Sequence, residues 1–71
     1  MKSLDLHGIS HESAKVLVVT FIDSNLDKLP IEIITGNSNY MKKIVLDIVN
    51  KYDLKASPKN YYNLGCLVIN N

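Results

Sequence analysis

The chain has 71 residues, of which 46% are hydrophobic and 21% are charged. This length predicts one small domain over residues 1–71, and this composition excludes an intrinsically disordered protein. The formal net charge is only +1 and all eight basic residues are lysine, which excludes a strongly basic nucleic-acid binder and bidentate recognition by arginine.

The first predicted strand begins at Leu4 and ends before Gly8. Because successive side chains of a strand alternate between its faces, Leu4 and Leu6 share the core face while Asp5 and His7 share the other. A carboxylate beside an imidazole can orient the ring and fix its tautomer. Asp5 and His7 are therefore candidate catalytic residues, although a satisfied surface histidine at a strand end would explain the same pattern.

A first helix is predicted from His11 to Lys28, with Ser10 as its N-cap and Leu29–Pro30 as its end. The polar residues from Asp23 to Lys28 form the end of this predicted helix. The apolar positions at helical spacing are Ala14, Leu17, Val18, Val19, Phe21 and Ile22.

The β-branched run Ile31–Thr35 predicts a second strand, which Gly36 ends. A strand, a helix and a strand form a βαβ unit with parallel strands, whose ends emerge at the same edge of the sheet. We therefore expect His7 and Thr35 to be near neighbours.

A second helix follows the turn cluster Gly36–Asn39. Its N-terminus, with Lys42 and Lys43 in the first turns, presents unpaired amides and the positive end of a dipole, which suits an anion such as phosphate. A plain capped helix with a solvated lysine pair is the alternative. The apolar stripe of this helix consists of Met41, Ile44, Val45, Ile48, Val49 and Tyr52.

The last third of the chain carries weaker signals. The segment Asp53–Asn60 contains Pro58 and predicts a short edge strand or an irregular connection. In a strand, Tyr61 and Tyr62 would face opposite ways, so at most one could stack on a base while the other packs into the core. The run Cys66–Ile69 predicts a final strand that is covered on both faces.

The single cysteine, Cys66, predicts a buried, inert thiol and no internal disulfide, which suits a reducing compartment. No apolar run is long enough to cross a bilayer, and Met1–Asp5 does not open a signal peptide. We therefore expect an intracellular, cytoplasmic monomer without membrane contact.

With these residues in place, the chain resembles the Smr (small MutS-related) domain over nearly its whole length. The family closes its first strand with LDLHG, carries A…V…F in its first helix, ends its second strand with TG, opens its second helix with LK or IK, and enters its last strand through glycine. The matching segments here are Leu4–Gly8, Ala14 with Val18 and Phe21, Thr35–Gly36, Met41–Lys42 and Gly65–Val68.

The resemblance implies an α/β fold: a two-layer βαβαββ sandwich with a mixed four-stranded sheet and two helices, similar to the C-terminal domain of translation initiation factor three. It also implies contact with DNA or RNA, since several Smr domains bind or nick nucleic acid.

Three departures from the family pattern concern the region that would hold the substrate. The loop Gly36–Tyr40 lacks the family's second glycine and is shortened, Gly65 stands where the family has GGxG, and the arginines common in the family are absent. The pattern fits either a reduced nuclease or a binding module that keeps only the fold.

The first hypothesis is a nicking endonuclease that hydrolyses phosphodiesters of DNA or RNA. In it His7 acts as general acid or base or holds the scissile phosphate, and Asp5 orients it. A site with one carboxylate and one histidine is no dedicated metal cage, so Mg²⁺ would be held partly by substrate phosphates. The alternatives are a non-catalytic nucleic-acid-binding module and a protein-interaction domain. The predicted phosphate-binding residues are Gly8, Thr35, Gly36, Asn37, Ser38 and Lys42.

Overall fold

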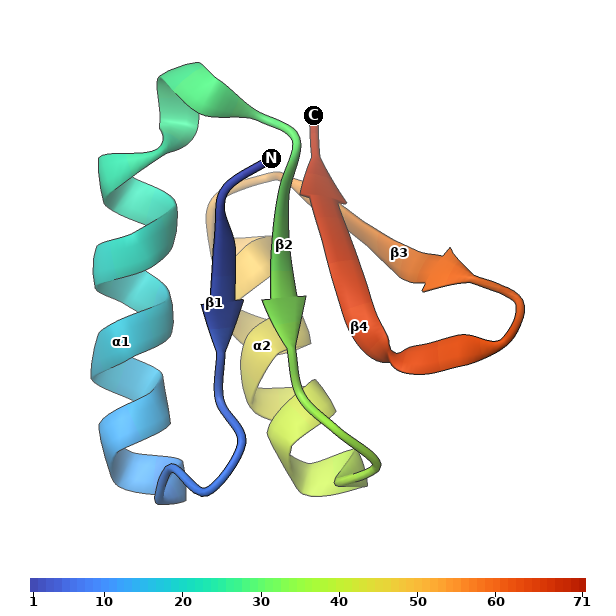
Figure 1. The fold of residues 1–71 in the computed structure, drawn as a ribbon. Coiled ribbons are helices and arrows are strands. Elements are labelled where there is room, and N and C mark those ends of the chain that lie inside the picture. The colour runs from blue at the N-terminus through green and yellow to red at the C-terminus, as the bar shows by residue number, and fades with distance from the viewer.

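A computed structural model describes residues 1–71 as two helices and one mixed four-stranded sheet, which confirms the predicted α/β fold with βαβαββ order (Figure 1). The strand order is β1-β2-β4-β3, with β1 parallel to β2 and the other two pairs antiparallel. The elements are β1 (Ser3–Asp5), α1 (His11–Ser24), β2 (Ile31–Ile34), α2 (Asn39–Lys51), β3 (Lys55–Asn60) and β4 (Asn63–Asn70).

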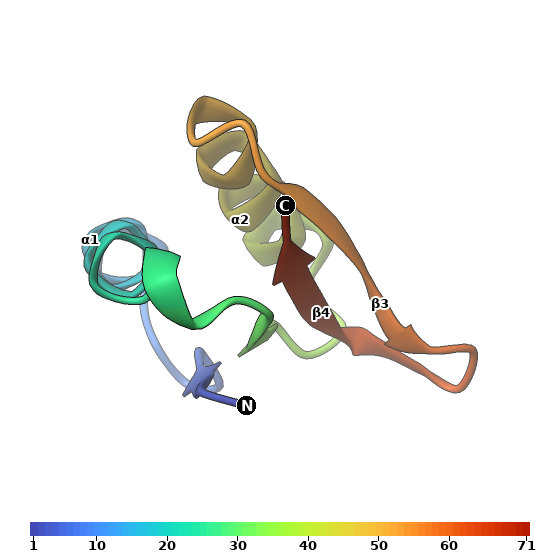
Figure 2. The same ribbon diagram turned by 90° about the horizontal axis from the view of Figure 1, so that it is seen from above.

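Both helices cover the same face of the sheet, so the molecule has two layers (Figures 1 and 2). Alternate residues of the central strands, such as Ile31 and Ile33 of β2, point to the helices and are fully buried. The core between the layers consists of Leu6, Ala14, Val18, Ile22, Ile31, Ile33, Met41, Ile44, Val45, Ile48, Val49, Leu54, Leu67 and Ile69.

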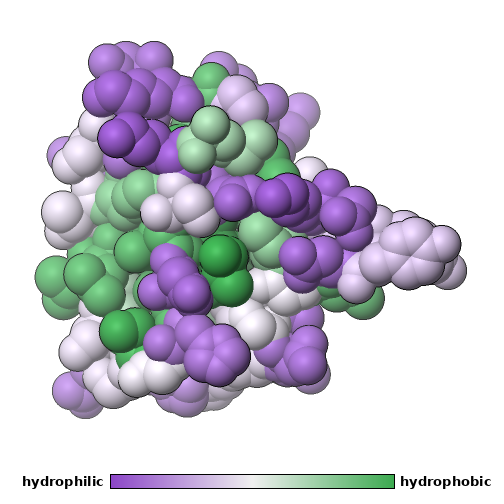
Figure 3. Space-filling view, viewed as in Figure 1, coloured by the Kyte–Doolittle hydropathy of each residue, from purple (hydrophilic) through white to green (hydrophobic).

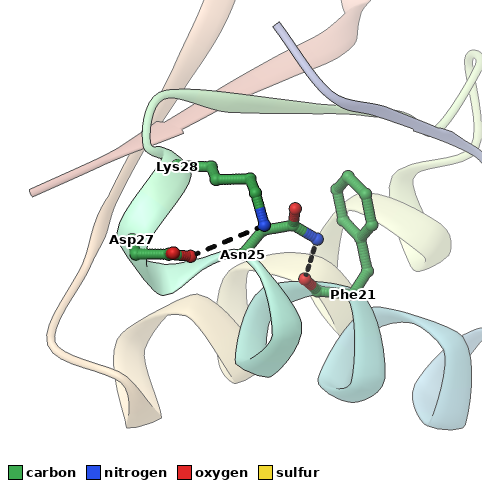
Figure 4. A network of polar contacts seen from close by, with 4 residues as sticks. All are labelled: Phe21, Asn25, Asp27 and Lys28. Carbon is green, nitrogen blue, oxygen red and sulfur yellow. Dashed lines mark hydrogen bonds and ion pairs between the residues drawn. The ribbon is translucent and has the colours of Figure 1, made fainter.

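The first helix ends at Ser24, earlier than the predicted end at Lys28. The buried Asn25 donates its side-chain amide to the Phe21 carbonyl at 2.7 Å (Figure 4). Its backbone amide donates to the Ile22 carbonyl. Since asparagine competes with the helix for backbone groups in this way, the chain leaves the α-helical path. A single 3₁₀ turn, Leu26–Lys28, follows and contains an exposed Lys28–Asp27 ion pair at 3.8 Å.

Strands β3 and β4 form a hairpin whose tip extends away from the two helices. The Asn60 carboxamide oxygen accepts the amides of Tyr62 and Asn63, which closes the turn. Tyr61 and Tyr62 therefore lie at the tip, 86% and 93% exposed, and the prediction that one of them packs into the core is wrong. Segment Asp53–Asn60 forms an edge strand from Lys55 onward, with an irregularity between Pro58 and Asn60.

The face of the sheet opposite the helices, here called the open face, is not covered by another layer. The prediction that Cys66–Ile69 is covered on both faces is therefore wrong, because Cys66 and Val68 belong to the open face while Leu67 and Ile69 belong to the core. Figure 3 views the molecule from this side and shows hydrophobic residues interspersed with hydrophilic ones.

Three side chains from different strands meet on the open face. Lys59 of β3 pairs with Glu32 of β2 at 3.1 Å, and the Cys66 thiol of β4 lies 3.7 Å from the same carboxylate oxygen. The hydrogen bond from Lys59 holds the pKa of Glu32 below its ordinary value. Burial, followed by the negative charge of Glu32, raises the pKa of Cys66, which is only 3% exposed and is buried as predicted. Neither helix has the length and apolar composition needed to span a lipid bilayer.

Candidate functional site

The two parallel strands end at one edge of the sheet, where each chain segment turns into the following helix (Figure 1). Gly8, with φ +75°, makes the turn after β1, and Gly36, with φ +66°, makes the turn after β2. Both are left-handed conformations that glycine adopts without steric penalty. As a result, the N-termini of α1 and α2 lie together at this edge.

Each helix begins with a serine cap. The Ser10 hydroxyl accepts the Ser13 amide at 3.2 Å, and the Ser38 hydroxyl accepts the Met41 amide at 3.1 Å. A cap of this kind satisfies one of the free amides of the first turn and leaves the others available to solvent or a ligand. Two positive dipole ends therefore converge at the same edge of the sheet.

A pocket of about 270 Å³ lies at this edge and is here called the strand-end pocket. It contains six of the eight predicted site residues, which come from the two turns. His7 and Thr35 both line it, as the parallel βαβ connection predicts. The lining residues are Leu6, His7, Gly8, Ile9, His11, Thr35, Gly36, Asn37, Ser38 and Met41.

The two other predicted residues do not line the strand-end pocket. Strand β1 ends at Asp5, so His7 lies beyond the strand and not on one strand face with Asp5. The Asp5 carboxylate accepts the backbone amide of His7 at 2.8 Å and makes no hydrogen bond to its ring. Asp5 therefore shapes the turn, because an aspartate readily accepts the amide two residues later. Lys42 lies on α2 outside the pocket lining, and its amide donates to the Ser38 carbonyl.

Thr35 and Gly36 form part of the pocket wall and also attach it to β4. The Thr35 and Gly36 amides both donate to the Gly65 carbonyl, at 2.7 and 3.1 Å, and the Thr35 hydroxyl lies within hydrogen-bond distance of the Gly36 and Gly65 carbonyls. A hydroxyl has one proton to donate, so that of Thr35 is engaged within the protein. The donors of Thr35 and Gly36 are therefore used within the protein, which leaves those of Asn37 and Ser38 in this part of the pocket lining.

Sequence reasoning missed His11 as a site residue and treated it only as the first residue of a helix. In the structure its imidazole lines the strand-end pocket and stacks on Tyr40, with ring centroids 4.4 Å apart and an interplanar angle of 20°. His7 and His11 thus place two imidazoles around one pocket. The sequence signal that could have found His11 is its position directly after the Ser10 cap, at the edge where β1 ends.

The lining of the strand-end pocket contains no carboxylate, and no group of three or more His, Cys, Asp or Glu side chains that could hold a metal ion occurs in the structure. Mg²⁺ prefers an octahedral shell of oxygen ligands, commonly including one or two carboxylates. The donors present do not fit a resident Mg²⁺ ion, whereas imidazoles and helix amides fit an anion.

Comparisons with protein-family models, with curated proteins and with solved structures found no match to this chain. The resemblance to the Smr domain rests on the motifs in the sequence and stays a prediction.

Proposed function

We propose that this chain is an Smr-like domain that binds nucleic acid by seating a phosphodiester group in the strand-end pocket. The observation that carries the proposal is the meeting of six predicted residues between two helix N-termini. Phosphate oxygens would accept hydrogen bonds from first-turn amides, from the side chains of Asn37 and Ser38, and from the imidazoles of His7 and His11. The near-neutral charge of the chain makes such binding moderate in affinity and sensitive to salt.

The binding proposal is tested by fluorescence anisotropy with labelled DNA and RNA oligonucleotides at low salt, followed by a salt titration. We expect saturable binding by the wild type. We also expect His7→Ala and Asn37→Ala to weaken it by about tenfold, because each removes a hydrogen bond to a charged group. Ser24→Ala, at the opposite end of α1, is the control and should bind like the wild type. Absence of saturable binding at low salt would reject the proposal.

A second candidate function is phosphodiester hydrolysis at the same pocket, and the observation that favours it is the pair of imidazoles, His7 and His11. One neutral imidazole would accept a proton from the attacking water as its oxygen bonds to phosphorus. The other, protonated, would donate a proton to the leaving oxygen as the P–O bond breaks. The engagement of Asp5 with a backbone amide favours binding without cleavage, since the carboxylate does not orient either ring.

Cleavage is tested on supercoiled plasmid and on structured RNA. We expect His7→Ala and His11→Ala each to lower the rate by about a hundredfold or more. Asp5→Asn retains the side-chain oxygen that accepts the His7 amide and should keep nearly full activity, whereas Asp5→Ala should lose part of it. Loss of activity in Asp5→Asn would instead support the predicted role of the Asp5 carboxylate in orienting His7. Equal trace cleavage in all variants would indicate a contaminant. The hydrolysis proposal would then fail, and only the binding proposal would remain.

A further inference from the structure

A second hollow of about 300 Å³ lies on the helical side of the molecule, between α1 and α2. Its floor contains Ile44 and Ile48, which are largely buried, and its rim carries three lysines and one aspartate. We call it the lysine groove. Its lining residues are Lys15, Tyr40, Lys43, Ile44, Asp47, Ile48 and Lys51.

The charge of the lysine groove favours an anionic occupant. Lys43 pairs with Asp47 at 3.1 Å, whereas Lys15 and Lys51 make no ion pair. The groove therefore keeps two uncompensated positive charges, one on each helix. Along α2 it extends from Tyr40 to Lys51, which is about 16 Å at 1.5 Å per residue, the length of a few stacked nucleotides at about 3.4 Å each.

The lysine groove adjoins the strand-end pocket through one aromatic stack. Tyr40 lines the groove, His11 lines the pocket, and the two rings are stacked. Tyr40 as a whole is 57% exposed, and its ring stacks on His11 through one face only, which leaves the other face for a ligand. A flat, unpaired base can stack on an aromatic ring, but the faces of a base inside a duplex are covered by its neighbours.

From this continuity we propose that the lysine groove carries a single strand of nucleic acid away from the strand-end pocket, with phosphates beside Lys15 and Lys51 and one base stacked on Tyr40. This inference rests on the proposed function and specifies its substrate class. It makes single strands, of DNA or RNA, the preferred ligands over duplexes.

The test compares the affinities of labelled 12-nucleotide strands, oligo(dT) and oligo(rU), with that of a 12-base-pair duplex. We expect the wild type to prefer the single strands and the double variant Lys15→Ala/Lys51→Ala to bind them at least about fivefold more weakly. Losing two phosphate contacts should also lower the salt slope by about 1.4. The control is Lys2→Ala/Lys55→Ala, which removes two exposed lysines outside the groove and should change the affinity by less than about twofold. The DNA and RNA probes show which sugar the groove prefers.

Three further variants separate stacking and local charge from bulk charge. Tyr40→Leu should weaken binding by about fivefold or more while Tyr40→Phe, which keeps the ring, should not. Asp47→Asn should tighten binding by about twofold, because it releases Lys43 and removes the negative charge from the groove. All of these side chains are at the surface, so we expect each variant to keep the fold. Thermal unfolding of each variant checks this.

Three outcomes would overturn the inference. The groove and control double variants could lose affinity equally, the wild type could bind duplex and single strand with equal affinity, or it could bind poly-glutamate as tightly as the single strands. If His7→Ala weakens binding and Lys15→Ala/Lys51→Ala does not, the groove proposal fails and the pocket proposal stands. If the wild type binds no nucleic acid, both fail.

Discussion

Gly65 approaches the backbone of Gly36 so closely that it has no room for a side chain, whereas Gly36 is restricted by its left-handed φ of +66°. A Cβ atom on Gly65 would lie 2.9 Å from the Gly36 carbonyl oxygen, a distance that real contacts do not show. Gly36 cannot easily move away, because its amide and that of Thr35 are held by the Gly65 carbonyl. The strand-end pocket therefore depends on a residue that is not part of it and that lies 29 positions further along the chain.

We expect Gly65→Ala to destabilise the protein by about 1–3 kcal/mol, because the added methyl group is forced against backbone. At an unhindered position outside the left-handed region the same substitution would stabilise by about 0.4–1 kcal/mol, so the sign is diagnostic. Urea unfolding followed by circular dichroism measures it. Asn70→Ala, at an exposed site on the same strand, should change stability by less than about 0.5 kcal/mol. A Gly65→Ala protein as stable as the wild type would contradict the close approach.

At the scale of elements, the Glu32–Lys59 pair joins strands that are not neighbours. Glu32 is on β2 and Lys59 is on β3, and β4 lies between these two strands. The pair thus crosses the open face and attaches the hairpin to the centre of the sheet. Because the pKa of Glu32 is lowered in the folded state, the folded protein favours the ionised carboxylate more than the unfolded chain does.

Because of this pair, we expect the free energy of unfolding to decrease as the solution becomes acidic. Its contribution is present above the ordinary carboxyl pKa near 4.5 and is lost as the pH falls through the lower pKa of folded Glu32. We expect Glu32→Gln to be less stable than the wild type at pH 7, and the difference to shrink at pH 3. Urea unfolding of both proteins at the two pH values measures it. A difference that is the same at pH 3 and pH 7 would show that the charge of Glu32 does not contribute.

The stabilisation from this ion pair is also lost at high pH, when Lys59 loses its proton. The hydrogen bond to Glu32 raises the pKa of Lys59, so its contribution is complete below the ordinary lysine pKa near 10.5 and is lost as the pH rises through the higher folded value. The plateau of stability from this pair therefore lies between the two transitions.

At the scale of the whole molecule, the helices cover only one face of the sheet. Neighbouring residues of one strand therefore differ in how deeply they are buried. Ile33 points to the helices and is fully buried, whereas Ile34 lies on the open face and is half-buried. Removing a methyl group from a close-packed core leaves a cavity, but on a half-covered surface the space is filled by solvent or by movement of neighbours.

We expect Ile33→Val to lower the free energy of unfolding by about 0.5–1.5 kcal/mol and Ile34→Val to lower it by less than about 0.5 kcal/mol. The two variants are a matched pair, since the chemical change is identical and the positions are adjacent. Equilibrium unfolding in urea gives both values. An equal loss in the two variants would mean that the open face is covered in solution, which sedimentation of the wild type would then reveal as a dimer.

Local signals in the sequence were enough to predict both helices, the first two strands and the last strand, because periodicity, caps and turn residues act over a few neighbouring positions. For β3 they left two alternatives, a short edge strand or an irregular connection. They located the cap Ser10, the apolar stripe of α2 and the turns at Gly8 and Gly36, whereas the cap Ser38 was recognised only in the structure. The βαβ rule then placed the loops after β1 and β2 at one edge of the sheet, so most of the candidate pocket could be predicted before the structure.

The tertiary structure was required for features that depend on side-chain contacts between distant segments or on competition for a single hydrogen bond. The Asp5 carboxylate could have bonded the His7 ring or its amide, and only the geometry of the turn decided for the amide. The position of Tyr61 and Tyr62 depended on the hairpin turn, and that of His11 on the packing of two helix N-termini. The motif Leu4–Gly8 thus predicted where the site lies, whereas packing across the whole chain decided which side chains line it.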